Sequence, residues 1–181
     1  MKQEIRIIGG QYRGKKLHFP NVEGLRPTPD RVRETLFNWL MHEIRDARCL
    51  DAFAGSGALG FEAFSRGASQ VVFVEQSVPA HTNLQKIINS FESPSLKLIK
   101  MDARQYLQTS KEQFDIIFLD PPFAQNYLPS CIADLAKTNL LAQGGLIYLE
   151  SATAIEIDEN QWRQVKSKKA GQVLYGLFEK L

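Results

Sequence analysis

The segment DAFAGSGALG at residues 51–60 decides the fold, and it continues an apolar run that begins near residue 48. Gly55, Gly57 and Gly60 match the spacing G-x-G-x-x-G where a strand over 48–53 gives way to a helix over 58–66. Glycine permits a tight turn there and lets the backbone approach a ligand closely. The segment therefore predicts a ligand-binding turn at the carboxyl end of a strand.

Outward from this turn, apolar strands and helices alternate. Strands are expected near 48–53, 70–75, 95–100, 114–120 and 145–150, with helices near 58–66, 78–90, 102–108 and 127–139. This order predicts an α/β fold with a doubly wound, mainly parallel Rossmann-like sheet covered on both faces. Two further strand-like runs, at 161–166 and 172–179, have no helix between them and should form an antiparallel hairpin at one sheet edge.

The N-terminal part has a different pattern. Runs at 5–8 and 15–19 flank three glycines and predict a β-hairpin. Thr28 and Pro29 have the residue types of an N-cap and a first helical position, and apolar residues recur every four positions through Ile44. We therefore expect a hairpin over 1–24, a helix over 25–46 that covers the cofactor cleft, and a core over 47–181.

Length and composition limit the protein class. At 181 residues and 20.5 kDa, the chain is expected to form one domain, since domains span about 100–200 residues. No apolar run approaches the ~20 residues that span a bilayer, and the N-terminus lacks a signal-peptide stretch, so a cytoplasmic protein with no membrane partner is expected. Cys49 and Cys131 have no metal-ligand spacing, so no metal is expected and both are interpreted as buried.

Charge is distributed unevenly along the chain. Residues 1–33 hold eight basic and three acidic side chains, a net charge of +5, and residues 163–181 have a net charge of +4. The middle then carries −7 within a total of +2. Basic ends favour contact with a polyanion such as RNA, although an ordinary solvated surface explains them too.

Three carboxylates follow strands and are candidate ligand contacts. Asp51 precedes the glycine turn, where it suits the cationic groups of S-adenosylmethionine better than the pyrophosphate of a nicotinamide dinucleotide. Glu75 ends the strand VVFVE and can accept both ribose hydroxyls of either cofactor. Asp102 can accept from an adenine amino group or cap the helix over 102–108.

The segment FDIIFLDPPF at 114–123 indicates the reaction class. It is a buried strand that runs into Asp120-Pro121-Pro122-Phe123. Two prolines stiffen the turn and leave carbonyl acceptors, Asp120 adds a carboxylate, and Phe123 adds a flat apolar face. Acceptors beside a stacking ring suit the exocyclic amine of a nucleobase.

The topology brings the two signals together. In a doubly wound sheet, the strands at 48–53 and 114–120 are neighbours at the switch point, about 4.8 Å apart. A methyl donor at the glycine turn and an amine at Asp120 would then meet in one crevice, and such alignment can lower a barrier by roughly 7–11 kcal/mol. No strong general base is required, because the ammonium that forms on methyl transfer is conjugated to the ring and very acidic, so Asp120 or water can take its proton.

These residues resemble a known family. DAFAGSGALG, Glu75 and DPPF are similar to class I S-adenosylmethionine-dependent amino-methyltransferases. RIIGGQYRGKKL (6–17), LRPTPDRVRETLFNWL (25–40) and KAGQVLYGLFEK (169–180) resemble the RsmD-type bacterial enzymes. That resemblance covers nearly the whole chain and implies methylation of the N2 of a guanine in small-subunit (16S) ribosomal RNA, free or within an assembling ribonucleoprotein particle, with S-adenosylhomocysteine as the second product.

The resemblance also implies roles for individual residues, and a monomer is expected. The amine would contact Asp120, Pro121, Pro122 and Phe123. The donor would contact Asp51, Phe53, Gly55, Gly57, Glu75, Asp102, Thr28 and Arg31. The RNA would contact Arg6, Arg13, Lys15, Lys16, Arg26, Arg33, Lys168 and Lys169. Which of Arg26, Arg31 and Arg33 binds donor and which binds RNA stays open, and Glu34 can instead pair with one of them in a structural ion pair.

Three other functions are compatible with parts of this sequence. A DNA adenine-N6 methyltransferase would use the same chemistry, but a chain of this length leaves little outside the sheet to contact a duplex. A nicotinamide-dependent oxidoreductase would leave DPPF without a role and lacks a proton donor at the crevice. An RNA-binding assembly factor with an inactive pocket would not require Asp120 beside an intact glycine turn.

Overall fold

The computed structural model describes residues 3–122 and 126–181. Phe123, predicted above to stack on the target base, lies outside the described residues. No helix in these ranges is long and apolar enough to cross a membrane.

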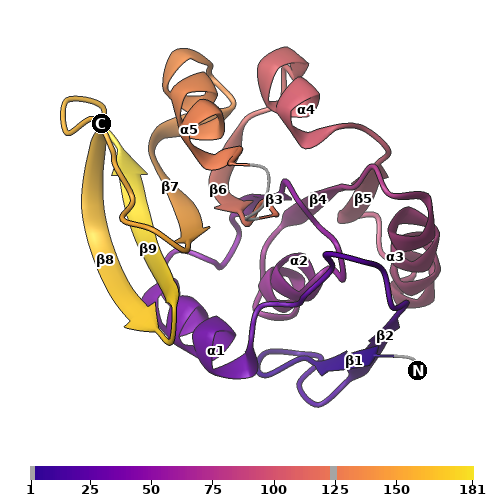
Figure 1. The fold of residues 1–181 in the computed structure, drawn as a ribbon. Coiled ribbons are helices and arrows are strands. Elements are labelled where there is room, and N and C mark those ends of the chain that lie inside the picture. The colour runs from indigo at the N-terminus through magenta and orange to yellow at the C-terminus, as the bar shows by residue number, and fades with distance from the viewer. Residues whose placement is uncertain (1–2, 123–125) are drawn as a thin grey trace.

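A seven-stranded sheet forms the centre of the molecule (Figure 1). Its order is β5-β4-β3-β6-β7-β9-β8, with the first five strands parallel and β9 antiparallel to both neighbours. This confirms the predicted doubly wound sheet and its C-terminal edge hairpin. The strands are β3 (Arg48–Asp51), β4 (Gln70–Val74), β5 (Leu96–Ile99), β6 (Phe114–Leu119), β7 (Leu141–Ser151), β8 (Trp162–Ala170) and β9 (Val173–Lys180).

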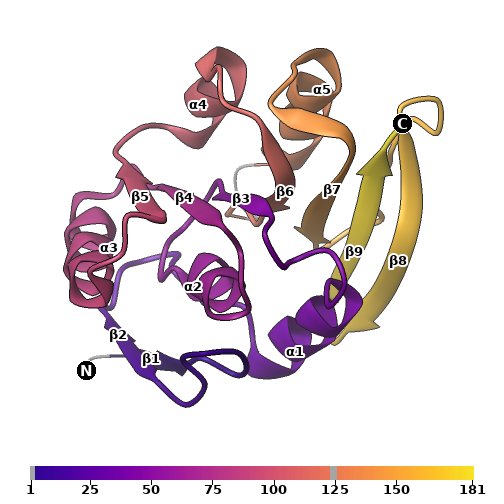
Figure 2. The same cartoon turned by 180° about the vertical axis from the view of Figure 1, so that it is seen from behind.

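Five helices cover the two faces of the sheet, as Figures 1 and 2 show from opposite sides. One face carries α1 (Asp30–Trp39), α2 (Ala58–Ser65) and α3 (Val78–Phe91), and the other carries α4 (Ala103–Thr109) and α5 (Leu128–Lys137). In α3 the buried apolar stripe is Ala80, Leu84 and Ile88, spaced every four residues, whereas α2 is buried on nearly all sides. Strand residues alternate between the faces, which produces two apolar clusters.

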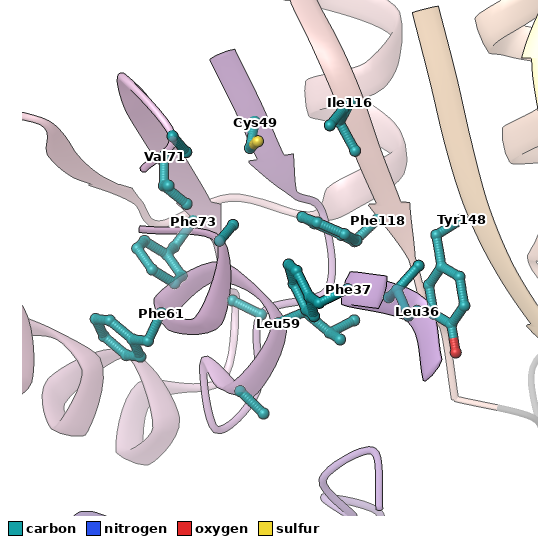
Figure 3. Packing of buried hydrophobic residues seen from close by; sticks show 14 of the residues in the cluster. Leu36, Phe37, Cys49, Leu59, Phe61, Val71, Phe73, Ile116, Phe118 and Tyr148 are labelled. Atoms are coloured by element: carbon teal, nitrogen blue, oxygen red, sulfur yellow. The ribbon is translucent and has the colours of Figure 1, made fainter. Parts of the chain in front are cut away.

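The cluster beneath α1 and α2 is rich in aromatic rings (Figure 3). Phe37 of α1 lies 5.8 Å from Phe118 of β6, centroid to centroid, and Phe61 of α2 lies 4.6 Å from Phe73 of β4. Gly60 makes the second contact possible, because a Cβ at this position would lie 2.2 Å from a Phe73 ring atom. The third glycine of the G-x-G-x-x-G spacing therefore serves the packing of α2 on the sheet.

The N-terminal hairpin, β1 (Gln3–Arg6) and β2 (Lys16–Phe19), forms a separate two-stranded sheet against α2. The Glu62 carboxylate of α2 accepts hydrogen bonds from the backbone N–H groups of Ile8 (3.0 Å) and Gly9 (2.9 Å). Ser65 Oγ accepts from the Tyr12 N–H at 2.9 Å and donates to the Gly9 carbonyl at 2.6 Å. The hairpin loop is thus attached to the last turn of α2.

The predicted helix over 25–46 was too long, because α1 runs only from Asp30 to Trp39, and its predicted N-cap was also wrong. The N-cap of α1 is Pro29, with no side-chain capping bond, and Thr28 precedes it. The Thr28 hydroxyl instead bonds to a residue 92 positions later in the chain. A tertiary contact has therefore replaced the local cap that the sequence favours.

Candidate active site

The candidate site is the crevice at the carboxyl ends of β3 and β6. These strands are adjacent and parallel, with Asp51 in register with Phe118, two residues before Asp120. The glycine turn and the Asp120-Pro121-Pro122 turn therefore leave the sheet at the same edge. This is the switch point of a doubly wound sheet, where such folds bind ligands.

The glycine turn has the backbone that its sequence predicts. Gly55 and Gly57 have φ values of 54° and 80°, in the left-handed region that favours glycine. A Cβ on Gly57 would lie 2.4 Å from the Phe61 ring, whereas one on Gly55 would come no closer than 3.6 Å to Leu25. Gly55 thus combines a left-handed φ with no clash at the Cβ position, so its lack of a side chain is not required by protein packing and suits close approach of a ligand.

Asp51 is buried at the base of this turn. One carboxylate oxygen accepts the Gly60 N–H at 3.0 Å, and the side chain takes part in none of the ion pairs formed by the described residues. Burial raises the pKa of Asp51 from its ordinary 3.8 to about 7, the Gly60 bond opposes this, and Glu75 adds to it. A buried acid that has no cationic partner among the described residues suits a positively charged ligand. Asp51 and the glycine turn therefore fit S-adenosylmethionine, which carries cationic groups.

Glu75 and Asp102 both contact backbone N–H groups. The oxygens of Glu75 accept from the N–H groups of Gly55 and Ser77, each at 2.8 Å. Each oxygen keeps a second acceptor position, so a ribose hydroxyl can still be bound. Asp102 caps α4 by accepting the Gln105 N–H at 3.0 Å, which establishes one of its two expected roles and leaves the adenine contact a prediction.

The segment at 25–28 crosses the crevice. Leu25 lies beside Gly55, and the Thr28 hydroxyl donates to Asp120 Oδ2 at 3.3 Å. Pro121 is buried and Pro122 is exposed, so the double-proline turn is anchored at its first residue. The sequence analysis assigned Thr28 to the methyl donor, but its observed partner, Asp120, is a residue expected to contact the target amine.

An aromatic pair on the other side of the turn was missed by the sequence analysis. Phe53, predicted to contact the donor, stacks on Tyr127 with a centroid separation of 6.4 Å and an interplanar angle of 18°. The Arg104 guanidinium lies 5.7 Å from the centre of the same Tyr127 ring. Tyr127 follows the DPPF segment closely, and that proximity is the signal that could have identified it.

The assignment of Arg33 to RNA was wrong. Its side chain is 0% exposed and bonds to Glu62 at 3.3 Å, to Asp30 and to the Arg6 carbonyl. A structural ion pair was expected for one arginine of this cluster, but with Glu34 rather than with Glu62 and Asp30. Arg26 and Arg31, by contrast, are exposed near the crevice.

The structure separates the remaining basic residues into two groups. Lys168 and Lys169 are exposed on β8, where Lys168 is in register with Tyr175 and, one strand further, with Glu150 at the crevice edge. Arg13 lies in the hairpin loop that packs on the last turn of α2, while the crevice lies at the opposite end of this eight-residue helix, about 10 Å away along its axis. Arg6 and Arg13 also share a groove with Asp30 and Glu34, which offset their charge.

The other hairpin lysines already have partners. Lys15 Nζ lies 4.0 Å from the centre of the Phe91 ring, and exposed Lys16 pairs with Glu4 at 3.2 Å. The exposed basic side chains left for a contact at the crevice are therefore Arg26 and Arg31, with Lys168 and Lys169 on β8, two strands away from Glu150.

A second buried acid beside Asp120 was also missed. Glu150 is 7% exposed near the end of β7 and accepts the Tyr148 hydroxyl at 2.5 Å. The run LIYLE at 146–150 ends in an acid just as VVFVE does at 71–75, and that similarity was the available signal.

Comparisons with known proteins agree with this geometry. Ribosomal RNA small subunit methyltransferase D of Haemophilus influenzae is 43% identical over 183 residues, which cover 98% of this chain and 95% of that protein. The protein of the same name from Escherichia coli K12 is 42% identical over 179 residues, covering 98% and 90%. A solved structure described as the putative methyltransferase yhhF from Escherichia coli superposes with a TM-score of 0.91 at 40% identity, covering 98% of both chains.

The family model described as Conserved hypothetical protein 95 matches residues 5–179, almost the whole chain. Together with two relatives above 40% identity, this confirms the resemblance drawn from the motifs. The chain belongs to the family of the ribosomal RNA small subunit methyltransferase D proteins.

Proposed function

We propose that this protein transfers a methyl group from S-adenosylmethionine to the exocyclic N2 amine of a guanine in small-subunit ribosomal RNA. The observation that carries the proposal is the adjacency of β3 and β6, which brings the Asp51–Gly55 turn and Asp120 to one crevice. The names and titles of the relatives support the same reaction class.

Each side of the crevice supplies one part of the chemistry. When bound, S-adenosylmethionine supplies an electrophilic methyl group on a sulfonium. Asp51 would attract its cationic part, Glu75 would hold the ribose, and Gly55 would allow close approach. Asp120 and the Pro121 carbonyl would accept the two N–H groups of the amine and direct its nitrogen toward the methyl carbon.

RNA would reach this crevice over the edge formed by Arg26, Arg31, Lys168 and Lys169. The target base would be splayed out of a loop or of a partly assembled particle, since an A-form helix hides base edges. Contacts with Arg6, Arg13, Lys15 and Lys16 would require RNA that also extends along α2 to the hairpin. We propose a monomer acting on ribosomal RNA.

Transfer of labelled methyl groups to RNA from an undermethylated strain tests the function, with duplex DNA as a second substrate. We expect N2-methylguanosine in small-subunit RNA and no label in DNA. Asp120→Ala should lower the rate by roughly 10²–10³-fold while binding of S-adenosylhomocysteine, measured by thermal shift, stays intact. Exposed Glu159→Ala is the matched control. Stabilisation by NADH instead, or label in adenine, would overturn the proposal.

A further inference from the structure

Asp120 has a second carboxyl group directly beside it. On the parallel strands β6 and β7, Leu119 is in register with Leu149, so the next pair along is Asp120 and Glu150. Paired residues on neighbouring strands point to the same face, which here is the α1 face that Phe118 and Tyr148 also occupy. The two acids therefore meet at the end of the sheet, next to the crevice.

Each acid accepts a hydrogen bond from a hydroxyl group of another residue. The Tyr148 hydroxyl donates to Glu150 Oε1 at 2.5 Å, and Thr28 donates to Asp120 Oδ2 at 3.3 Å. Tyr148 is fully buried, with its ring beside α1 in Figure 3, and Thr28 is 5% exposed. Both acids thus have fixed partners before any ligand binds.

The other groups near the pair do not neutralise it. Asp51 faces it from β3, Tyr148 from β7, Tyr175 from β9 and Thr28 from the segment before α1. Neither Asp120 nor Glu150 takes part in the ion pairs found in the described ranges. Desolvation, then Glu150, raises the pKa of Asp120 well above its ordinary range, because half-buried Asp120 and buried Glu150 cannot both be ionised cheaply at close range.

We propose that Glu150 is a positioning residue: it carries the negative charge of the pair and receives a hydrogen bond from a protonated Asp120, so that Asp120 offers the target amine a neutral carbonyl oxygen. The Tyr148 hydroxyl stabilises the charge on Glu150, and Thr28 orients the Asp120 oxygen. The proposal rests on the proposed function, since it assigns Asp120 to the amine. A protonated acid donates from one oxygen and accepts at the other, as a side-chain amide does.

Asparagine at position 120 is therefore the decisive variant. Its NH2 group can donate to Glu150 and its carbonyl can accept from Thr28 and the amine, so Asp120→Asn should keep kcat within about tenfold of the wild type. Asp120→Ala should lose roughly 10²–10³-fold. The double variant Asp120→Asn/Glu150→Gln removes the charge but keeps the shapes, and it should fall at least about tenfold below Asp120→Asn, a difference of ~1.4 kcal/mol. If Asp120→Asn is folded, binds S-adenosylhomocysteine and is as inactive as Asp120→Ala, the proposal is overturned.

Carboxyl-carbon NMR gives a readout that needs no catalysis. In the wild type, the Asp120 carbon should titrate well above the ordinary range. In Glu150→Gln it should titrate at least about one pH unit lower, a shift that a purely structural role of Glu150 would not produce. Glu159→Gln should leave it unchanged. If the Asp120 carbon of the wild type titrates in the ordinary range of an aspartate, the shared proton is refuted, even if Glu150→Gln does not fold. If that carbon titrates well above the ordinary range but the wild type transfers no methyl group, the result counts against the proposed function instead.

Discussion

We expect substitution of Glu62 to lower the thermal stability of the protein strongly. Its side chain is fully buried in α2, and its carboxylate accepts four hydrogen bonds. Oε2 accepts from the Ile8 N–H and the Arg33 guanidinium, and Oε1 accepts from the Gly9 N–H and the Arg66 guanidinium. The hairpin, α1 and α2 are therefore all bonded to this one carboxylate.

Glu62→Gln should therefore be strongly destabilising despite its similar shape. The amide replaces one acceptor oxygen with an NH2 group that would face two N–H donors, and it leaves the charge of fully buried Arg33 without its buried partner. Breaking a buried pair in this way costs about 3–5 kcal/mol. For a chain of this size, that predicts a fall in Tm of about 8–13 °C.

Thermal unfolding followed by circular dichroism at pH 7 measures this effect. Glu4→Gln is the control, because it removes an ion pair with Lys16 in which both side chains are about half exposed and should shift Tm by no more than about 3 °C. A Glu62→Gln protein that unfolds within about 3 °C of the wild type would refute the reasoning.

Three further predictions follow from the packing and the charges. Gly60→Ala should lower stability by about 1–3 kcal/mol in denaturant unfolding, since its Cβ would lie 2.2 Å from a Phe73 ring atom. Asp51→Asn should raise Tm at pH 8. Because the pKa of Asp51 is raised to about 7 in the folded protein, the wild type loses stability as pH rises from about 4 to about 7, and the variant does not. The same variant should weaken the binding of S-adenosylmethionine, measured by calorimetry. Lys168→Gln/Lys169→Gln should weaken RNA binding and lower the slope of log affinity against log salt by ~1.4.

A matched control or a contradicting outcome belongs to each of these predictions. Gly14→Ala also meets a positive φ, but its Cβ would have no atom within 4 Å, so it separates backbone strain from overpacking. A wild type whose Tm does not fall between pH 4 and 7 relative to Asp51→Asn would contradict the titration of Asp51. Lys86→Gln/Lys111→Gln removes two exposed lysines from α3 and the segment before β6; an equal loss of salt dependence would mean that β8 has no special role.

The sequence predicted the parts of the site that depend on strand order. Periodicity placed β3 and β6, and the switch-point rule then made Asp51 and Asp120 neighbours, as the structure confirms. The donor contact expected of Gly57 stays a prediction, and the structure adds that the missing side chains of Gly57 and Gly60 make room for Phe61 and Phe73.

The errors concern contacts between distant segments. Arg33 has the residue type of a phosphate ligand, and only the position of Glu62, 29 residues away, makes it a core residue. Thr28 likewise has the sequence of a helix cap but bonds to Asp120 across 92 residues. Side-chain partners of this kind follow from how elements pack, which local patterns do not specify.

The outer strand β8 has a consequence for solubility. It is the last strand in the sheet order, and its residues from Arg163 to Lys169 are exposed. An outer strand offers backbone groups to which a second copy can add its own strand, and lysine is the residue that most often prevents such addition. The cations of β8 should therefore keep molecules apart through mutual repulsion, so that charge-neutral variants of this strand would form aggregates at concentrations where the wild type stays dispersed.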